Sequence, residues 1–111
     1  MDELLDRVPD LDAVFAASDL MAAGAIGTLR RRGLSVPDDV AVGGFDNSGR
    51  AATLDPPLTT MHQPFGRISS EMVGLLLELI HGAPQKSVTM PARLVVRERR
   101  TGLSAGAGPR V

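Results

Sequence analysis

The sequence predicts an α/β domain with a mainly parallel sheet flanked by helices. Short apolar runs alternate with helical stretches, in the order strand, helix, strand, loop, strand, helix, strand. The run at 40–45 is apolar throughout instead of alternating, which predicts a parallel strand covered on both faces. The parallel connections are expected to be right-handed.

Residues 19–33 predict a helix that packs on this sheet, after a helix end at 2–8 and a buried strand at 12–18. Its apolar side chains share one face: Ala22, Ile26 and Leu29. Ser18 or Asp19 can accept hydrogen bonds from its first free N–H groups. Gly33 can adopt the left-handed conformation that ends it.

The second half of the chain predicts a third strand at 59–63, then a helix that begins at Pro64 and ends before Gly82. Its apolar residues recur at helical spacing and form one stripe, which consists of Ile68, Met72, Leu75, Leu76, Leu79 and Ile80. We interpret this stripe as core, or as core plus a subunit interface. Residues 87–91 and 93–100 are expected to be extended, and 101–111 to form a disordered tail.

Composition excludes several classes of function. The chain has 111 residues, a net charge of −1, three aromatic residues and no cysteine. A basic or aromatic nucleic-acid surface, a disulfide framework and a thiolate metal site are therefore not expected. The acidic N-terminus is unlike a signal peptide, and no apolar run is long enough for a membrane span. We expect a cytoplasmic protein without cofactor, metal or membrane contact.

Polar residues end three of the predicted strands: Ser18, Asp46 and Gln63. The carboxyl ends of parallel strands lie along one edge of a sheet, where ligands bind. Hydroxyl, carboxylate and amide groups together suit a neutral ligand rich in O–H or N–H groups, such as a sugar or a nucleobase. Phe65 could supply an apolar wall for one face of that ligand.

Structural roles for the same residues remain open. Ser18 or Asp19 can be a helix cap, Gln63 can cap the helix after it, and Asp46 can brace its own loop. His62 and His81 lack metal partners at suitable spacing. The "RRR" and "RERR" runs favour solvated charge. An enzyme that uses Asp46 as a general base ranks low, because no second catalytic group accompanies it in a known motif.

The combination of "SDLMA", "GGFDNS", "PPLTTMHQP" and "RLVVRE" closely resembles the LacI/GalR family of bacterial transcription regulators. The resemblance runs from about residue 10 to residue 98. It implies the C-terminal subdomain of an effector-binding region of the type I periplasmic-binding-protein-like fold, partial here, over residues 1–100.

The resemblance also implies site roles. Asp46 matches the family acid that binds effector hydroxyls or base nitrogens, and Gln63 and Phe65 match positions that line the pocket. Ser18 stands where the family usually has an asparagine, which implies an altered choice of ligand.

The same resemblance sets expectations for the protein as a whole. We expect a fragment that binds a small effector only weakly on its own, that forms a homodimer and that is not an enzyme. DNA would be bound by a helix-turn-helix absent from this chain. The alternative is a solute-binding component of a transporter with the same fold.

Overall fold

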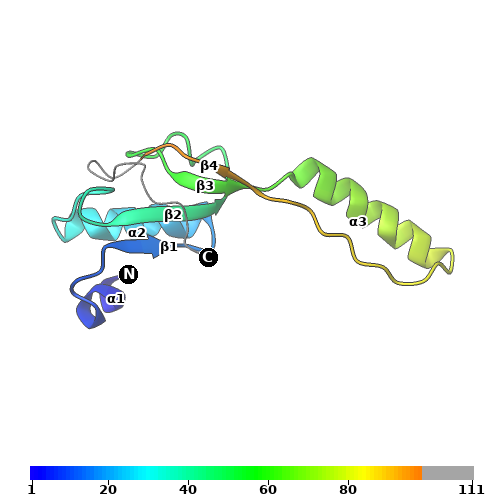
Figure 1. Cartoon of the computed structure of the whole chain (residues 1–111), viewed down its shortest axis with the longest axis horizontal. Helices are drawn as coiled ribbons and strands as arrows, with labels where there is room; N and C mark the ends of the chain where they lie inside the picture. The colour runs from blue at the N-terminus through cyan, green and yellow to red at the C-terminus, as the bar shows by residue number, and fades with distance from the viewer. Residues whose placement is uncertain (99–111) are drawn as a thin grey trace, which may run out of the picture.

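The computed structural model describes residues 1–98 and confirms the α/β architecture (Figure 1). The elements follow in the order α1 (Asp2–Arg7), β1 (Ala13–Phe15), α2 (Asp19–Arg31), β2 (Ala41–Asp46), β3 (Thr59–His62), α3 (Phe65–Ile80) and β4 (Arg93–Val95). They form one four-stranded sheet in the order β1-β2-β3-β4. The first three strands are parallel, and β4 runs antiparallel to β3.

Helix α2 packs on one face of the sheet and forms the core with it. Its predicted face is confirmed, because Ala22, Ile26 and Leu29 are buried. They pack with Val42 of β2 and with Leu58, which immediately precedes β3. The helix ends as expected, with Gly33 at a φ of 75°.

The prediction that β2 is covered on both faces is wrong for the described residues. Its burial alternates: Val42 and Gly44 are buried on the α2 side, whereas Gly43 and Phe45 are only half-buried. Phe15 of β1 meets Phe45 edge-to-face on the other side and is 64% exposed. The reason is that no described helix packs on that face.

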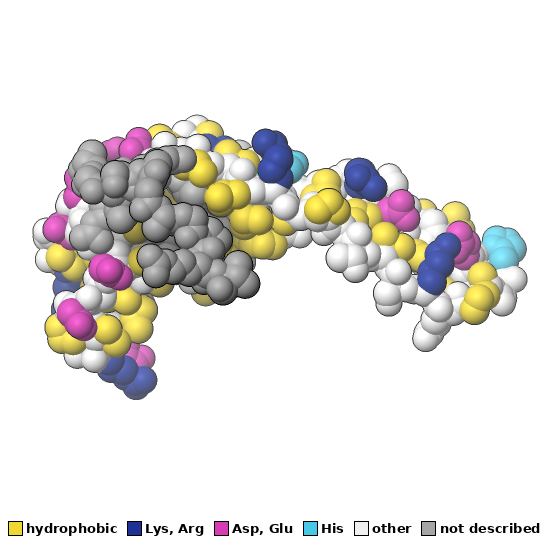
Figure 2. Space-filling model, viewed as in Figure 1, with side chains coloured by type: hydrophobic (Ala, Val, Ile, Leu, Met, Phe, Trp, Pro, Cys, Tyr) yellow, Lys and Arg dark blue, Asp and Glu magenta, His cyan; other side chains and the backbone are white. Residues whose placement is uncertain are grey.

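Helix α3 corrects a second prediction, because its apolar stripe is not core within residues 1–98. No α3 residue is buried, and Met72 and Ile80 are 64% and 69% exposed. The helix projects away from the sheet, and the following segment runs back alongside it to β4 (Figure 1). Figure 2 shows apolar and charged side chains along this arm. The radius of gyration is accordingly 18.2 Å, against about 13 Å for a compact chain of 100 residues.

The C-terminal elements are shorter than the sequence predicted. Residues 87–91 form no strand, and of the described part of the expected extended segment, residues 93–98, only Arg93–Val95 form a strand. The tail predicted at 101–111 lies outside the described residues.

Helix α1 is attached to the end of α2 by charge and by one apolar side chain. Arg32 donates to the carboxylates of Asp2 and Asp6, at 3.0 and 2.8 Å. Leu5, between these acids, is buried in the core cluster. The hydrogen bond from Arg32 lowers the pKa of the Asp2 carboxyl below its ordinary value of 3.8.

We expect the attachment of α1 to weaken in acid. A lowered folded-state pKa means that the stabilisation is present above about pH 3.8 and is lost as the pH falls through the folded value. The protection of the Leu5 amide from hydrogen exchange, relative to its intrinsic rate at each pH, should therefore fall in that range, and at neutral pH in Arg32→Gln. Arg7→Gln is the control, because Arg7 pairs with Glu3 of its own helix. An equal loss of Leu5 amide protection in both variants would contradict this role for Arg32.

Candidate functional site: the carboxyl edge of the sheet

The three parallel strands end at one edge of the sheet, as the sequence predicted. The pairing of Phe15 with Gly43 and of Asp46 with His62 sets the strand ends side by side. Ser18 follows β1 after two alanines and begins α2. Its Oγ accepts a hydrogen bond from the Met21 N–H at 3.2 Å, so the cap predicted at Ser18 or Asp19 is Ser18. The Ser18 hydroxyl can still donate its proton.

Asp46 and Gln63 are in direct contact. The Gln63 Nε2 donates to Oδ1 of Asp46 at 3.0 Å, and both side chains are half-buried. The Gln63 side chain therefore does not cap α3, whose N-terminus has no side-chain cap. Only Oδ1 of Asp46 is engaged by a described residue, which leaves Oδ2 to accept hydrogen bonds at the edge.

The remaining predicted residue, Phe65, is the first residue of α3 and is 52% exposed. Phe65 follows Gln63 by two residues, and its N–H donates to the Gln63 carbonyl at 2.9 Å. An exposed ring at this point offers an apolar surface beside the polar strand tips. Among the described residues, it is packed in no core cluster.

Two residues stabilise this edge through hydrogen bonds that the sequence did not predict. Asp19 is 1% exposed, and its carboxylate accepts from the Ser48 N–H and from the Thr60 hydroxyl. A signal was available in Gly44, because a glycine inside a strand often marks a close approach by another group. A Cβ at Gly44 would lie 2.6 Å from Oδ1 of Asp19.

Arg97 is the second missed residue, and it corrects the interpretation of "RERR" as solvated charge. Its guanidinium donates to Oδ1 of Asn47 at 2.7 Å and to the Leu58 carbonyl at 2.8 Å. The amide of Asn47 also lies 3.3 Å from Nδ1 of His62. The turn after β2 is therefore held by polar contacts on several sides. No sequence signal distinguished Arg97 from its charged neighbours.

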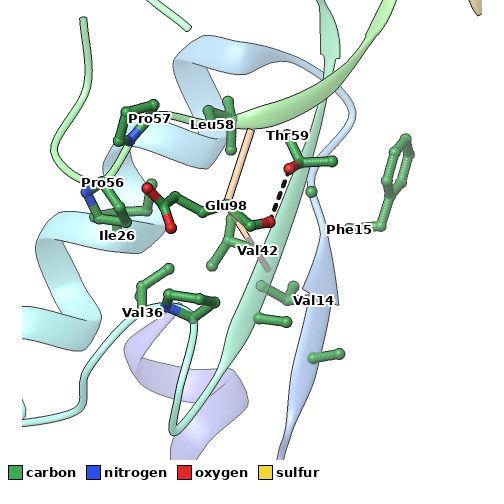
Figure 3. Close-up of a pocket in the computed structure, with 14 residues that line it drawn as sticks. Val14, Phe15, Ile26, Val36, Val42, Pro56, Pro57, Leu58, Thr59 and Glu98 are labelled. Carbon is green, nitrogen blue, oxygen red and sulfur yellow. Dashed lines mark hydrogen bonds between the residues drawn. The ribbon is translucent and has the colours of Figure 1, made fainter. Parts of the chain in front are cut away.

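A groove of about 350 Å³ lies at the opposite, amino ends of the strands (Figure 3). Its walls are mainly apolar and include Val36, Pro56 and Leu58. The Thr59 hydroxyl in its wall already donates to the Glu98 carbonyl at 3.1 Å. Apart from Thr59 and Glu98, the side chains that line this groove are apolar, so the carboxyl edge remains the candidate site.

Two further kinds of feature are absent from residues 1–98. No helix there has the length and apolar character needed to cross a membrane. No group of three or more His, Asp or Glu side chains there is arranged to hold a metal ion.

The fold agrees with the known proteins that this chain resembles. The periplasmic binding protein-like domain family matches residues 1–98. The HTH-type transcriptional regulator CelR of Thermobifida fusca is 50% identical over 96 residues, which cover 86% of this chain and 27% of CelR. A complex of the transcriptional regulator CelR with cellobiose has a TM-score of 0.80 at 47% identity and covers 87% of this chain and 30% of that one. A dimeric Lac repressor structure has a TM-score of 0.77 at 32% identity, with coverage of 88% and 36%.

An open, mostly parallel sheet with polar strand tips is the architecture expected of the periplasmic-binding-protein-like class. The chain belongs to the periplasmic binding protein-like domain family. Its relatives there are LacI-type transcription regulators, so the resemblance seen in the sequence is confirmed. The chain spans 27% of the length of CelR and 29% of the length of the repressor CytR of Escherichia coli K12.

Proposed function

We propose that this chain is the ligand-binding and dimerisation part of a LacI-type transcriptional regulator that senses a small polar, sugar-like effector. The observation that carries this proposal is the Asp46 carboxylate at the carboxyl edge, with one oxygen held by Gln63 at 3.0 Å. Ser18 and Phe65 complete the proposed half-site, with a hydroxyl group and an exposed ring. Cellobiose in the complex of CelR supports a sugar as the effector class.

The exposed surfaces support a part that works within a larger protein. The apolar stripe of α3 and the open face of the sheet require cover by another part of the regulator or by a second copy. We propose that the chain forms a homodimer, which the dimeric Lac repressor structure supports. Operator DNA would be bound by a domain outside this chain, because the chain itself carries a net charge of −1 and not a basic surface.

The proposed mechanism is a shift in population between two states. Ligand at the carboxyl edge would stabilise closure of this part against the rest of the effector domain, and so alter the affinity for DNA. Such coupling requires that the effector bind one state more tightly than the other. We propose that the regulator acts in the cytoplasm and is not an enzyme. The names of the relatives favour a regulator over the solute-binding component of a transporter.

Titration of the chain with cellobiose, followed by amide NMR, tests the proposed site. We expect millimolar or weaker binding, because half a cleft buries only part of the ligand. The largest shifts should fall at Ser18, Asp46 and Gln63. Asp46→Asn should weaken binding on the order of 10- to 100-fold, through loss of a charged acceptor. The variant should still fold, since an asparagine oxygen can accept from Gln63.

Asp12→Asn is the matched control, because it makes the same chemical change before β1, at the amino end of the sheet. It should leave the titration unchanged. Shifts confined to the amino-end groove, or equal weakening by both variants, would contradict the proposed site. Sub-millimolar affinity would show that this chain alone forms a complete site.

A further inference from the structure

A buried carboxylate connects three elements behind the proposed site. Asp19, in the first turn of α2, is 1% exposed. Its Oδ2 accepts from the Ser48 N–H at 2.7 Å, after β2, and its Oδ1 accepts from the Thr60 hydroxyl of β3 at 2.5 Å. A buried carboxylate is costly unless its oxygens are hydrogen-bonded, so both contacts are needed.

The backbone next to Ser48 adopts an uncommon conformation. Asp46 and Asn47 have φ angles of 118° and 55°. Residues other than glycine seldom hold such angles, and although asparagine adopts the left-handed region more readily than most, the φ of Asp46 needs support from its surroundings. Here the Ser48 N–H is fixed by Asp19 and the Asn47 side chain by Arg97. The φ of Asp46, together with the hydrogen bond from Gln63, sets the direction in which the Asp46 carboxylate leaves the backbone.

We propose that Asp19 is a positioning residue, whose contact with the Ser48 N–H sets the turn at residues 46–48 and so aims Asp46 at the effector. The role of Asp46 in this inference rests on the proposed function. Asp19 does not touch the effector. Its two contacts have different tasks: the contact with Ser48 sets the turn, and the contact with Thr60 stabilises the fold.

Three variants separate these tasks. Thr60→Val removes only the contact with Thr60. Asp19→Ala removes both contacts. Asp19→Asn can keep both, because its oxygen can accept from the Ser48 N–H while its amide group donates to the Thr60 hydroxyl, which can also accept. Thr60→Val and Asp19→Ala should both destabilise the fold, so a melting temperature alone cannot distinguish them.

Amide hydrogen exchange at Ser48, measured relative to Val42 in the core strand, is the first readout and needs no ligand. Asp19→Ala should lower the relative protection of Ser48 roughly 10-fold or more, the effect expected for a hydrogen bond to a charged group. Thr60→Val should leave it unchanged, and Asp19→Asn, which keeps a neutral acceptor for the Ser48 N–H, should lower it by less than Asp19→Ala does. Unchanged Ser48 protection in Asp19→Ala would overturn the proposal, as would equal loss in Thr60→Val.

The Ser48 amide proton shift keeps the test decisive if Asp19→Ala does not fold. Replacing a charged acceptor by a neutral one in Asp19→Asn should move this resonance upfield, and Thr60→Val should not. An unmoved resonance in Asp19→Asn would overturn the proposal.

Cellobiose then serves as the probe that links the turn to binding. If the wild-type chain responds to cellobiose, Asp19→Ala should weaken the response as much as Asp46→Asn does, whereas Thr60→Val should retain it. A full response in Asp19→Ala would refute positioning and leave the proposed site intact. Loss of Ser48 protection in a chain that never responds to cellobiose would support the turn contact and count against the proposed effector.

Discussion

Replacement of Gly44 by alanine is expected to destabilise the fold by about 2–5 kcal/mol, through overpacking and a disturbed buried hydrogen bond. A Cβ at this position would lie 2.6 Å from Oδ1 of Asp19 and 2.8 Å from Cδ2 of Leu58. Both neighbours are at least 98% buried, so neither can move into solvent. Urea denaturation monitored by circular dichroism would measure the change.

Gly43→Ala is the matched control, one residue earlier on the same strand. Its Cβ would meet only Cδ2 of Phe15, at 3.5 Å, which is an ordinary contact. Loss of a flexible glycine from a strand should make this variant neutral or more stable by ~0.5–1 kcal/mol. A similar destabilisation in both variants would show that Asp19 and Leu58 are not what limits the space at Gly44.

Truncation of Leu29 to alanine should have the other large effect, a loss of about 3–5 kcal/mol for a leucine in a closed core. Leu29 is fully buried between α2 and the sheet, where the surrounding side chains can collapse only partly into a cavity. Such a loss is a large fraction of the ~5–15 kcal/mol that stabilises a typical domain. The urea midpoint should fall sharply, with a similar slope.

Leu77→Ala makes the same chemical change on α3, where the side chain is 51% exposed. It should change the stability of this chain by less than ~0.5 kcal/mol, as surface substitutions usually do. The contrast tests whether α3 contributes to the core. A loss at Leu77 comparable to that at Leu29 would mean that α3 packs against an apolar surface in solution.

Much of the site's framework could be predicted from local sequence. Apolar runs located the strands, and the residue after each run located the polar tip. Parallel order then placed Ser18, Asp46 and Gln63 at one edge, because a long crossover, through α2 after β1 and through the loop 47–58 after β2, returns the chain in the same direction. The contact between Gln63 and Asp46 could not be foreseen, since it depends on the register between β2 and β3.

The roles of Asp19 and Arg97 needed the tertiary structure. The sequence places Asp19 at a helix start, where a carboxylate is normally a solvated cap or a partner of the helix dipole. Its partners lie 29 and 41 residues away, and only the packing of α2 on the sheet brings them together. Arg97 similarly meets Asn47 across 50 residues of sequence.

The sequence by itself determined the α/β class, the family, the order of elements and the edge at which the polar tips meet, because these follow from periodicity and chain direction. Only the tertiary structure decided that one face of the sheet is open and that the stripe of α3 lies outside the core. Periodicity shows that a face is apolar, but not what covers it. Burial depends on which surface lies opposite, and neither the spacing of Met72 and Leu76 nor their hydrophobicity contains that information.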